Sequence, residues 1–284
     1  MSAAPESASF ADRFAAGRAE LGPLVFGLDP SGALLVEWGL GDDADGLERF
    51  VDIVLEAARG RVAVAKPQSA FYERHGWPGI RALSRLVDAL RSDGVLVLLD
   101  AKRGDVGSTN AAYAEAYLGA GAPMPVDALT VTAYLGLAAM GPLVERAAGS
   151  GSALFVVTRS SNPEGRALQT ARQADGPTVE AAMLAAIGAL NADLAPGGIG
   201  PVGAVFAPTH GEAEVDLVSM NGLFLAPGLG AQGATVQDVA ECFATCPDRV
   251  LPSASRSLLS AGPDAAALAD AVQAMAEEVR KALA

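Results

Sequence analysis

The chain has 284 residues and a formal net charge of −13, and hydrophobic residues make up 51% of it but aromatic residues only 5%. This length fits one large domain, and a core rich in Ala, Val and Leu suits helices packed on a parallel sheet. The acidic balance, with no run of basic residues, argues against nucleic-acid binding. No apolar stretch is long and uninterrupted enough to span a bilayer, so we expect no membrane partner.

The N-terminal segment lacks the basic and apolar regions of a signal peptide, which predicts a cytoplasmic protein. Residues 1–20 are expected to form a leader segment with a partly ordered helix, and residues 21–284 a single domain.

Short β-rich runs alternate with Ala- and Leu-rich segments of helical periodicity along the chain. The predicted strands are residues 24–28, 62–65, 95–99, 128–131, 153–157, 202–206, 223–225 and 249–251. The clearest predicted helices are residues 45–57, 78–91, 110–118, 178–190, 236–243 and 263–283. Eight such units predict an α/β fold of the TIM (β/α)8 barrel class. A doubly wound open sheet is the alternative, but the first predicted strand is not followed by the glycine-rich turn typical of it.

Polar segments 160–177 and 195–203 are expected to be loops within this domain. Cys242 and Cys246, the only cysteines, have i, i+4 spacing and no nearby histidine. We interpret them as free thiols on one face of a helix rather than as a zinc site.

Charged residues recur at the predicted C-terminal ends of strands, where barrels of this class carry their functional groups. Asp29 follows the first strand, Lys66 the second, Asp100 and Lys102 the third, and Arg256 the eighth. Carboxylates beside an ammonium are costly to bury unless they pair, and they shift one another's pKa. Such clusters are typical of catalytic sites, although a salt bridge at a strand end would give the same pattern.

The spacing within residues 100–105 indicates which of these groups share a pocket. Positions i and i+2 of an extended strand point the same way, so Asp100 and Lys102 are expected to face one pocket. Asp105 follows a turn at Gly104 and need not face it.

Residues 227–233 form a glycine-rich segment before a predicted helix. Exposed backbone N–H groups in such a turn can bind a phosphate, with Gln232 and Arg256 as further donors. A tight loop without a ligand would explain the glycines alone.

Segments 66–73, 100–109, 157–163 and 227–233 together resemble the orotidine 5′-phosphate decarboxylase family, and the Lys-Pro-Gln signature at residues 66–68 resembles its second subfamily. The resemblance runs from about residue 24 to residue 260. It implies a homodimeric barrel that converts orotidine 5′-monophosphate to UMP and CO2, the last step of UMP biosynthesis, without a metal or organic cofactor.

The resemblance also implies roles for individual residues. The catalytic network would comprise Lys66, Asp100, Lys102 and Asp105, with Lys102 stabilising and protonating the C6 carbanion. Asp105 and Thr109 would reach into the partner subunit's site. The substrate-binding residues would be Asp29 for the ribose hydroxyls, Ser161 and Asn162 for the base or its loop, and Pro227, Gly230, Gln232 and Arg256 around the phosphate.

Two positions depart from the family pattern: Ala133 stands where proline is expected, and Ala207 where a glycine is expected. Both concern the wall expected to bind the base. His75 and His210 are interpreted as structural or solvent-facing.

Two other functions remain open. Sister enzymes that act on sugar phosphates share the Asp-x-Lys-x-x-Asp element but use Mg²⁺, and they would carry an acidic ligand where Lys66 stands. A non-catalytic nucleotide-binding barrel would keep Gln232 and Arg256 but could lose the pair of Asp100 and Lys102.

Overall fold

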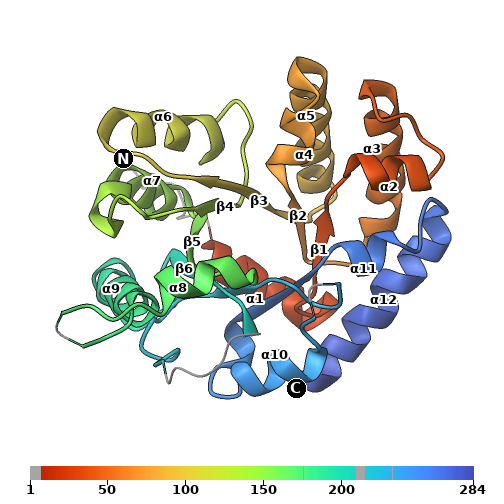
Figure 1. The fold of residues 1–284 in the computed structure, drawn as a ribbon. Coiled ribbons are helices and arrows are strands. Elements are labelled where there is room, and N and C mark those ends of the chain that lie inside the picture. Colours follow the sequence, from red (N-terminus) through yellow and green to blue (C-terminus); the bar gives the residue numbers. More distant parts are fainter. Residues whose placement is uncertain (1–7, 175, 209–214, 232) are drawn as a thin grey trace.

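Eight parallel strands close into a barrel in chain order in the computed structural model, which describes residues 8–174, 176–208, 215–231 and 233–284 (Figure 1). The strands are β1 (Val25–Leu28), β2 (Val64–Pro67), β3 (Leu96–Arg103), β4 (Ala128–Val131), β5 (Ala153–Arg159), β6 (Val202–Phe206), β7 (Phe224–Ala226) and β8 (Val250–Ala254). Each strand pairs in parallel with the next, and β8 closes on β1 with Ser253 opposite Val25. The predicted TIM barrel is confirmed.

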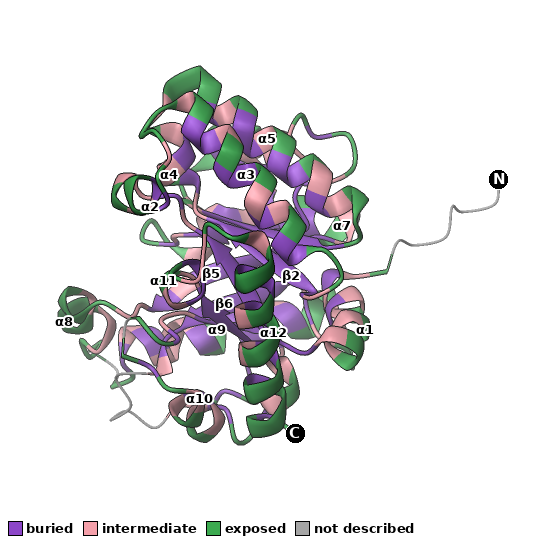
Figure 2. Cartoon of the chain, turned by 90° about the vertical axis from the view of Figure 1, so that its right-hand side faces the viewer, coloured by how far each residue is buried: buried purple, intermediate pink, exposed green. Residues whose placement is uncertain are grey.

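Helices surround the barrel and turn their buried faces toward the strands, as Figure 2 shows. The helices are α1 (Phe10–Leu21), α2 (Gly32–Glu37), α3 (Ala44–Ala58), α4 (Ser69–Glu73), α5 (Gly76–Ser92), α6 (Gly107–Tyr117), α7 (Gly141–Ser150), α8 (Arg166–Gln169), α9 (Val179–Leu194), α10 (Val236–Cys242), α11 (Arg256–Leu259) and α12 (Ala265–Ala282). Short 3₁₀ turns lie at Leu137–Met140, Pro163–Gly165 and Pro247–Arg249. No helix among the described residues is long and apolar enough to cross a membrane.

Helix α1 closes the N-terminal end of the barrel. Phe10 and Phe14 are fully buried in the cluster that fills the barrel interior, and the Phe10 ring packs edge-on against Phe155. Arg13 donates to the buried Asp127 at 2.5 Å, and Asp127 also accepts from the backbone of Val97. The leader segment expected over residues 1–20 therefore contains a helix packed on the barrel, while its residues 1–7 lie outside the described part of the chain.

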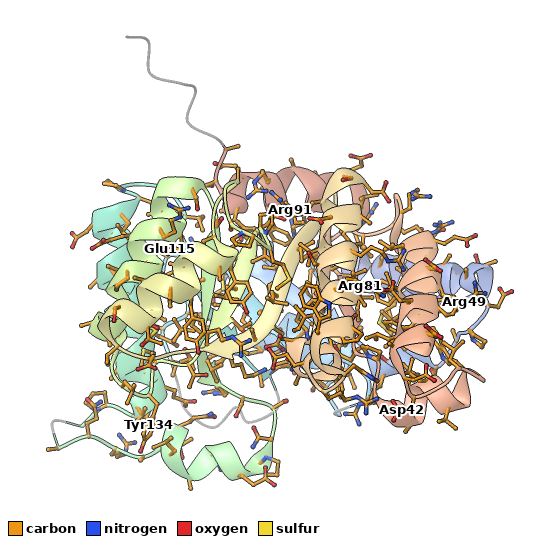
Figure 3. The ribbon with its side chains drawn as sticks, turned by 90° about the horizontal axis from the view of Figure 1, so that it is seen from above. Asp42, Arg49, Arg81, Arg91, Glu115 and Tyr134 are labelled. Carbon is orange, nitrogen blue, oxygen red and sulfur yellow. The ribbon has the colours of Figure 1, made fainter. Side chains whose placement is uncertain are left out.

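The two ends of the barrel differ in what covers them. Figure 3 shows Arg91 at the end that α1 covers, and Asp42 and Tyr134 at the opposite end, which the C-terminal ends of the strands face. The cavity that the charged strand ends line opens at the second end.

Two sequence expectations about loops and cysteines were wrong in part. Segment 160–177 contains the 3₁₀ turn Pro163–Gly165 and helix α8, which are too short to give a periodic pattern. Segment 195–203 is a loop as far as residue 201, and the strand predicted over residues 202–206 follows it as β6. The two cysteines do not share one helix face, because α10 ends at Cys242 and Cys246 lies in the segment that follows it. Both thiols are free as expected, and burial raises the pKa of Cys242 to about 11.

Candidate active site

A cavity of about 320 Å³ opens at the C-terminal ends of the strands. It brings together eight of the side chains predicted from the sequence: Asp29, Lys66, Asp100, Lys102, Ser161, Asn162, Pro227 and Arg256. They come from the ends of β1, β2, β3, β5, β7 and β8, because parallel strands in a barrel deliver their carboxyl ends to one rim.

Asp100 is the centre of the polar network. Its Oδ1 accepts hydrogen bonds from Lys102 Nζ at 2.7 Å and Thr130 Oγ1 at 2.8 Å. Its Oδ2 accepts from Lys66 Nζ at 3.2 Å and Gln68 Nε2 at 3.3 Å. Burial alone would raise the pKa of Asp100, but the two ammonium groups hold that pKa far below its usual range. Asp100 is therefore a carboxylate at neutral pH.

Lys66 is buried between two carboxylates. Its Nζ lies 3.2 Å from Asp100 Oδ2 and 3.9 Å from Asp29 Oδ1. Burial alone would lower the pKa of Lys66, but the charges of Asp29 and Asp100 outweigh it and raise that pKa. Asp29 Oδ1 is buried and has no hydrogen-bond partner among the described residues, so it can accept a hydrogen bond from a ligand's hydroxyl group.

Lys102 adopts a backbone conformation that the sequence did not indicate. Its φ is 47°, in the left-handed region, which costs a non-glycine residue about 1–2 kcal/mol. The register between β3 and β4 slips between Leu99 and Arg103, and Lys102 N donates to Thr130 Oγ1 at 2.9 Å. Lys102 does face Asp100, but the reason is this irregularity and not the alternation of an extended strand. Its side chain is 47% exposed, which leaves the ammonium accessible from the cavity.

The segment after β7 and the start of α11 form another wall of the cavity. The residues that line it here are Pro227, Gly228, Leu229, Ala231 and Arg256. Arg256 is exposed and forms no ion pair with a described carboxylate. Gln232 lies outside the described residues.

Gly230, which was predicted to lie at the phosphate, is not among the residues that line the cavity. Its N–H donates to Ala234 O at 2.8 Å, and its φ of 79° favours glycine. A Cβ at this position would lie 2.8 Å from Ser257 Cβ. Gly230 therefore shapes the turn and leaves contact with a ligand to its neighbours.

Asp105 and Thr109 lie away from the cavity of this chain. Asp105 accepts from the backbone of Val106 at 2.8 Å, and its own N–H donates to Asn110 Oδ1 at 3.0 Å. Thr109 is exposed in the first turn of α6. The structure thus separates these two residues from Asp100 and Lys102, as the turn at Gly104 suggested.

Sequence reasoning missed several polar groups of the site, including Ser160 and Ser253, which line the cavity. Gln68 and Thr130 donate to Asp100, and Ser255 lines the cavity beside Arg256. These residues could have been found in the sequence from their positions at the C-terminal ends of β2, β4, β5 and β8. Ala133 and Ala207, the two departures from the family pattern, are buried and do not line the cavity.

His75 is not among the residues that line the cavity. The side chain of His75 is mostly buried outside it, and burial is the main cause that lowers the pKa of His75. His210 lies outside the described residues.

Comparison with known proteins assigns the chain to a family. The model of the orotidine 5′-phosphate decarboxylase / HUMPS family matches residues 22–271. The chain belongs to this family. It is 50% identical over 275 residues to the orotidine 5′-phosphate decarboxylase of Salinispora arenicola, which covers 97% of this chain and 98% of that protein. The Streptomyces coelicolor orotidine 5′-phosphate decarboxylase is 49% identical over 264 residues, or 93% of this chain and 94% of that one.

A solved structure supports the same assignment. The Streptomyces avermitilis protein, assigned as an orotidine 5′-phosphate decarboxylase, superposes with a TM-score of 0.93 at 47% identity, covering 98% of this chain and 97% of the other. The resemblance that the four sequence segments indicated is therefore confirmed at the level of the family.

Proposed function

We propose that this family member decarboxylates orotidine 5′-monophosphate to UMP and CO2, the last step of pyrimidine nucleotide biosynthesis, without a metal or organic cofactor. The observation that carries the proposal is Asp100, which is held as a carboxylate between Lys66 and Lys102 inside a cavity that also presents Arg256.

Lys102 supplies the central chemistry of the proposed reaction. Loss of CO2 from C6 of the pyrimidine leaves a carbanion with no π-system to delocalise it, so the enzyme must stabilise the charge at that carbon. The ammonium of Lys102 does so and then donates the proton. Asp100, beside the substrate carboxylate, raises the energy of the bound substrate by charge repulsion, which is relieved as neutral CO2 departs.

The other cavity residues bind and orient the substrate in this proposal. Asp29 accepts from the ribose hydroxyls through its unpartnered Oδ1. Arg256 and the backbone N–H groups of Gly228 and Ala231, with Gln232, hold the phosphate. Ser161 and Asn162 contact the base or its loop. Binding energy from the phosphate, remote from C6, is used to orient the base.

The protein acts as a homodimer in this proposal, with Asp105 and Thr109 completing the cavity of the partner subunit. An exposed apolar side chain next to Asp105 supports an interface, since Val106 is 53% exposed. The two free thiols fit an enzyme that works in the cytoplasm.

The Mg²⁺-dependent reactions of sugar-phosphate enzymes in the same barrel are the second candidate. Asp29 and Asp100 could offer carboxylates to a cation, but the ammonium of Lys66 lies 3.9 Å and 3.2 Å from them and would repel it. The position of Lys66 therefore favours the decarboxylase.

The two candidates are separated by an assay of EDTA-treated wild-type protein. We expect loss of the absorbance of orotidine 5′-monophosphate with UMP as the product, and no dependence on added Mg²⁺. Turnover of pentulose or hexulose phosphates only after Mg²⁺ is restored would favour the second candidate instead.

A further inference from the structure

An ion pair outside the cavity links the end of β3, which carries Lys102, to helix α4, which follows the β2 strand that carries Lys66. Arg103 Nη2 donates to Glu73 Oε1, and to Tyr117 Oη at 3.3 Å. Glu73 Oε1 also accepts from Ser69 Oγ at 2.6 Å. The guanidinium carbon lies 5.6 Å from the ring centre of Tyr113 and 5.9 Å from that of Tyr117. We call Arg103, Glu73, Ser69, Tyr113 and Tyr117 the Arg103 brace.

The brace spans three elements. Ser69 and Glu73 belong to α4, and both tyrosines belong to α6. Figure 1 shows these helices on neighbouring sides of β3, the strand that Arg103 ends. The side chain of Arg103 therefore ties the end of β3 to the helices that follow β2 and β3.

The position of the brace in the chain connects it to the cavity. Arg103 directly follows Lys102, the residue with the left-handed backbone. Glu73 lies in the helix that begins after Lys66 and Gln68, the donors to Asp100 Oδ2. A strained backbone persists only where its surroundings over-determine it. The brace supplies one such contact next to Lys102, and it joins the end of β3 to the helix that follows β2.

Both ends of the pair are charged, and their charges cancel. Burial alone would raise the pKa of Glu73, but hydrogen bonds from Ser69 and Arg103 lower it. Burial would likewise lower the pKa of Arg103, whereas its contacts with Tyr117 and Glu73 raise it. Because the pair adds no net charge near the lysines, its influence on them comes from geometry.

We propose that Arg103 is a positioning residue, whose pairing with Glu73 and stacking on Tyr113 and Tyr117 hold the left-handed turn that places the Lys102 ammonium on Asp100. This inference rests on the proposed decarboxylase function. It assigns Arg103 no contact with the substrate.

Kinetics of Arg103→Met test the proposal. We expect kcat to fall by about 10–100-fold, since misplacing a catalytic group by about 1 Å has an effect of this order. The KM and the affinity for UMP should stay within about threefold of wild type, because Asp29 and Arg256 are untouched. The control is Arg85→Met, whose arginine also pairs with carboxylates, Glu48 and Asp52, but on the exposed face of α5. It should keep the wild-type kcat.

The double variant Arg103→Met with Glu73→Gln separates geometry from charge. It restores the net charge of the wild type but not the brace. A kcat as low as that of Arg103→Met supports positioning, whereas recovery to the wild-type kcat would show that the unpaired carboxylate of Glu73 was the cause and would overturn the proposal. An unchanged kcat in Arg103→Met would overturn it as well.

A second readout does not depend on turnover. Lys66, Lys102 and Lys281 are the only lysines of the chain, so selective ¹³Cε/¹⁵Nζ labelling gives three NMR signals. We expect Arg103→Met to shift the Lys102 signal and leave that of the distant, exposed Lys281 in place. An unmoved Lys102 signal would contradict the proposal. If the wild type does not decarboxylate orotidine 5′-monophosphate, the proposed function is wrong. The change in the Lys102 NMR signal then still tests whether the brace positions Lys102.

If Arg103→Met does not fold, the same kinetic and NMR measurements can be made on Ser69→Ala. It removes one hydrogen bond to Glu73 and leaves the ion pair. We expect the same pattern with a smaller loss of kcat, about 3–10-fold, and a wild-type kcat together with an unmoved Lys102 signal would again overturn the proposal.

Discussion

Asp100 is one carboxylate shared by four donors, so the chemistry of the site depends on its charge. Lys66 and Lys102 would repel each other without it, and Lys66 has little contact with water to compensate. Breaking a buried ion pair from one side is costly because the remaining charge stays buried without its partner. Asp100 therefore serves both stability and the proposed reaction.

Substituting Asp100→Asn should lower the free energy of unfolding by about 3–5 kcal/mol, together with a loss of kcat. Denaturant unfolding and steady-state kinetics measure the two effects. The matched control is Asp88→Asn, the same chemical change at an exposed position of α5, which should alter neither. Equal stability of the two variants would contradict the pairing described for Asp100.

The stability that this network supplies should be independent of pH between about 5 and 9. The lowered pKa of Asp100 means that its contribution is complete above about pH 4 and is lost only in stronger acid. The raised pKa of Lys66 means that its contribution persists below about pH 10 and is lost as the pH rises through the folded-state value. The difference in unfolding free energy between wild type and Asp100→Asn should thus be flat from pH 5 to 9. A difference that shrinks toward pH 5 would show that Asp100 takes up a proton there.

At the scale of elements, the two ends of the barrel have separate tasks. Helix α1 seals one end with Phe10 and Phe14, and the loops after β7 and β8 form the cavity wall at the other. Changes in the buried face of α1 should therefore affect stability without affecting catalysis, and changes in the loops after β7 and β8 should affect substrate binding.

Phe14→Ala should destabilise the protein by about 3–5 kcal/mol, because it leaves a cavity among buried side chains. The kcat and KM should be unchanged under conditions in which the variant is folded. Val36→Ala, at a side chain that is 65% exposed, is the control and should cost about 0.5 kcal/mol or less. A comparable cost for both variants would mean that α1 does not pack as described.

Arg256→Ala should raise the KM by about 10–100-fold, the loss expected when hydrogen bonds to a charged group are removed. Orotidine, which lacks the phosphate, provides the matched substrate. Its turnover should respond little to the same substitution. If the substitution impaired turnover of both substrates equally, Arg256 would not bind the phosphate.

The sequence predicted the elements well, because a barrel imposes a strict order on its strands and leaves their polar ends at one rim. Asp29, Lys66, Asp100 and Arg256 could be predicted on that ground alone. The left-handed backbone of Lys102 could not, since a positive φ at a non-glycine residue depends on tertiary contacts such as the hydrogen bond to Thr130. Helix α8 was missed because four residues show no periodicity. The hydrogen bond from Gly230 N to Ala234 O could not be predicted either, because a glycine-rich turn does not reveal which N–H groups it uses internally.

At the scale of the whole molecule, the cavity of one chain lacks two of the residues proposed for it. Asp105 and Thr109 lie on the outside near the exposed side chain of Val106, so the proposed site is complete only when a second copy supplies them. A closed two-fold arrangement would give each cavity one contribution from its partner.

Mixing two inactive variants tests this shared site. Asp105→Ala and Lys102→Ala should each be inactive alone, and should regain part of the activity after subunit exchange, because one of the two sites in a mixed dimer is then intact. Mixing Asp100→Ala with Lys102→Ala provides the control. Both residues come from the same chain in each cavity, so neither cavity of this mixed dimer is intact. Absence of recovery after verified exchange would contradict the shared site.

The most direct test of the account is the decarboxylation of orotidine 5′-monophosphate by wild type and by Lys102→Ala, measured together with the affinity of both proteins for UMP. We predict conversion to UMP by the wild type, no detectable turnover by Lys102→Ala, and retained UMP binding that shows an intact cavity. Turnover by Lys102→Ala at a rate near that of the wild type would contradict the assignment of Lys102 as the group that stabilises and protonates the carbanion.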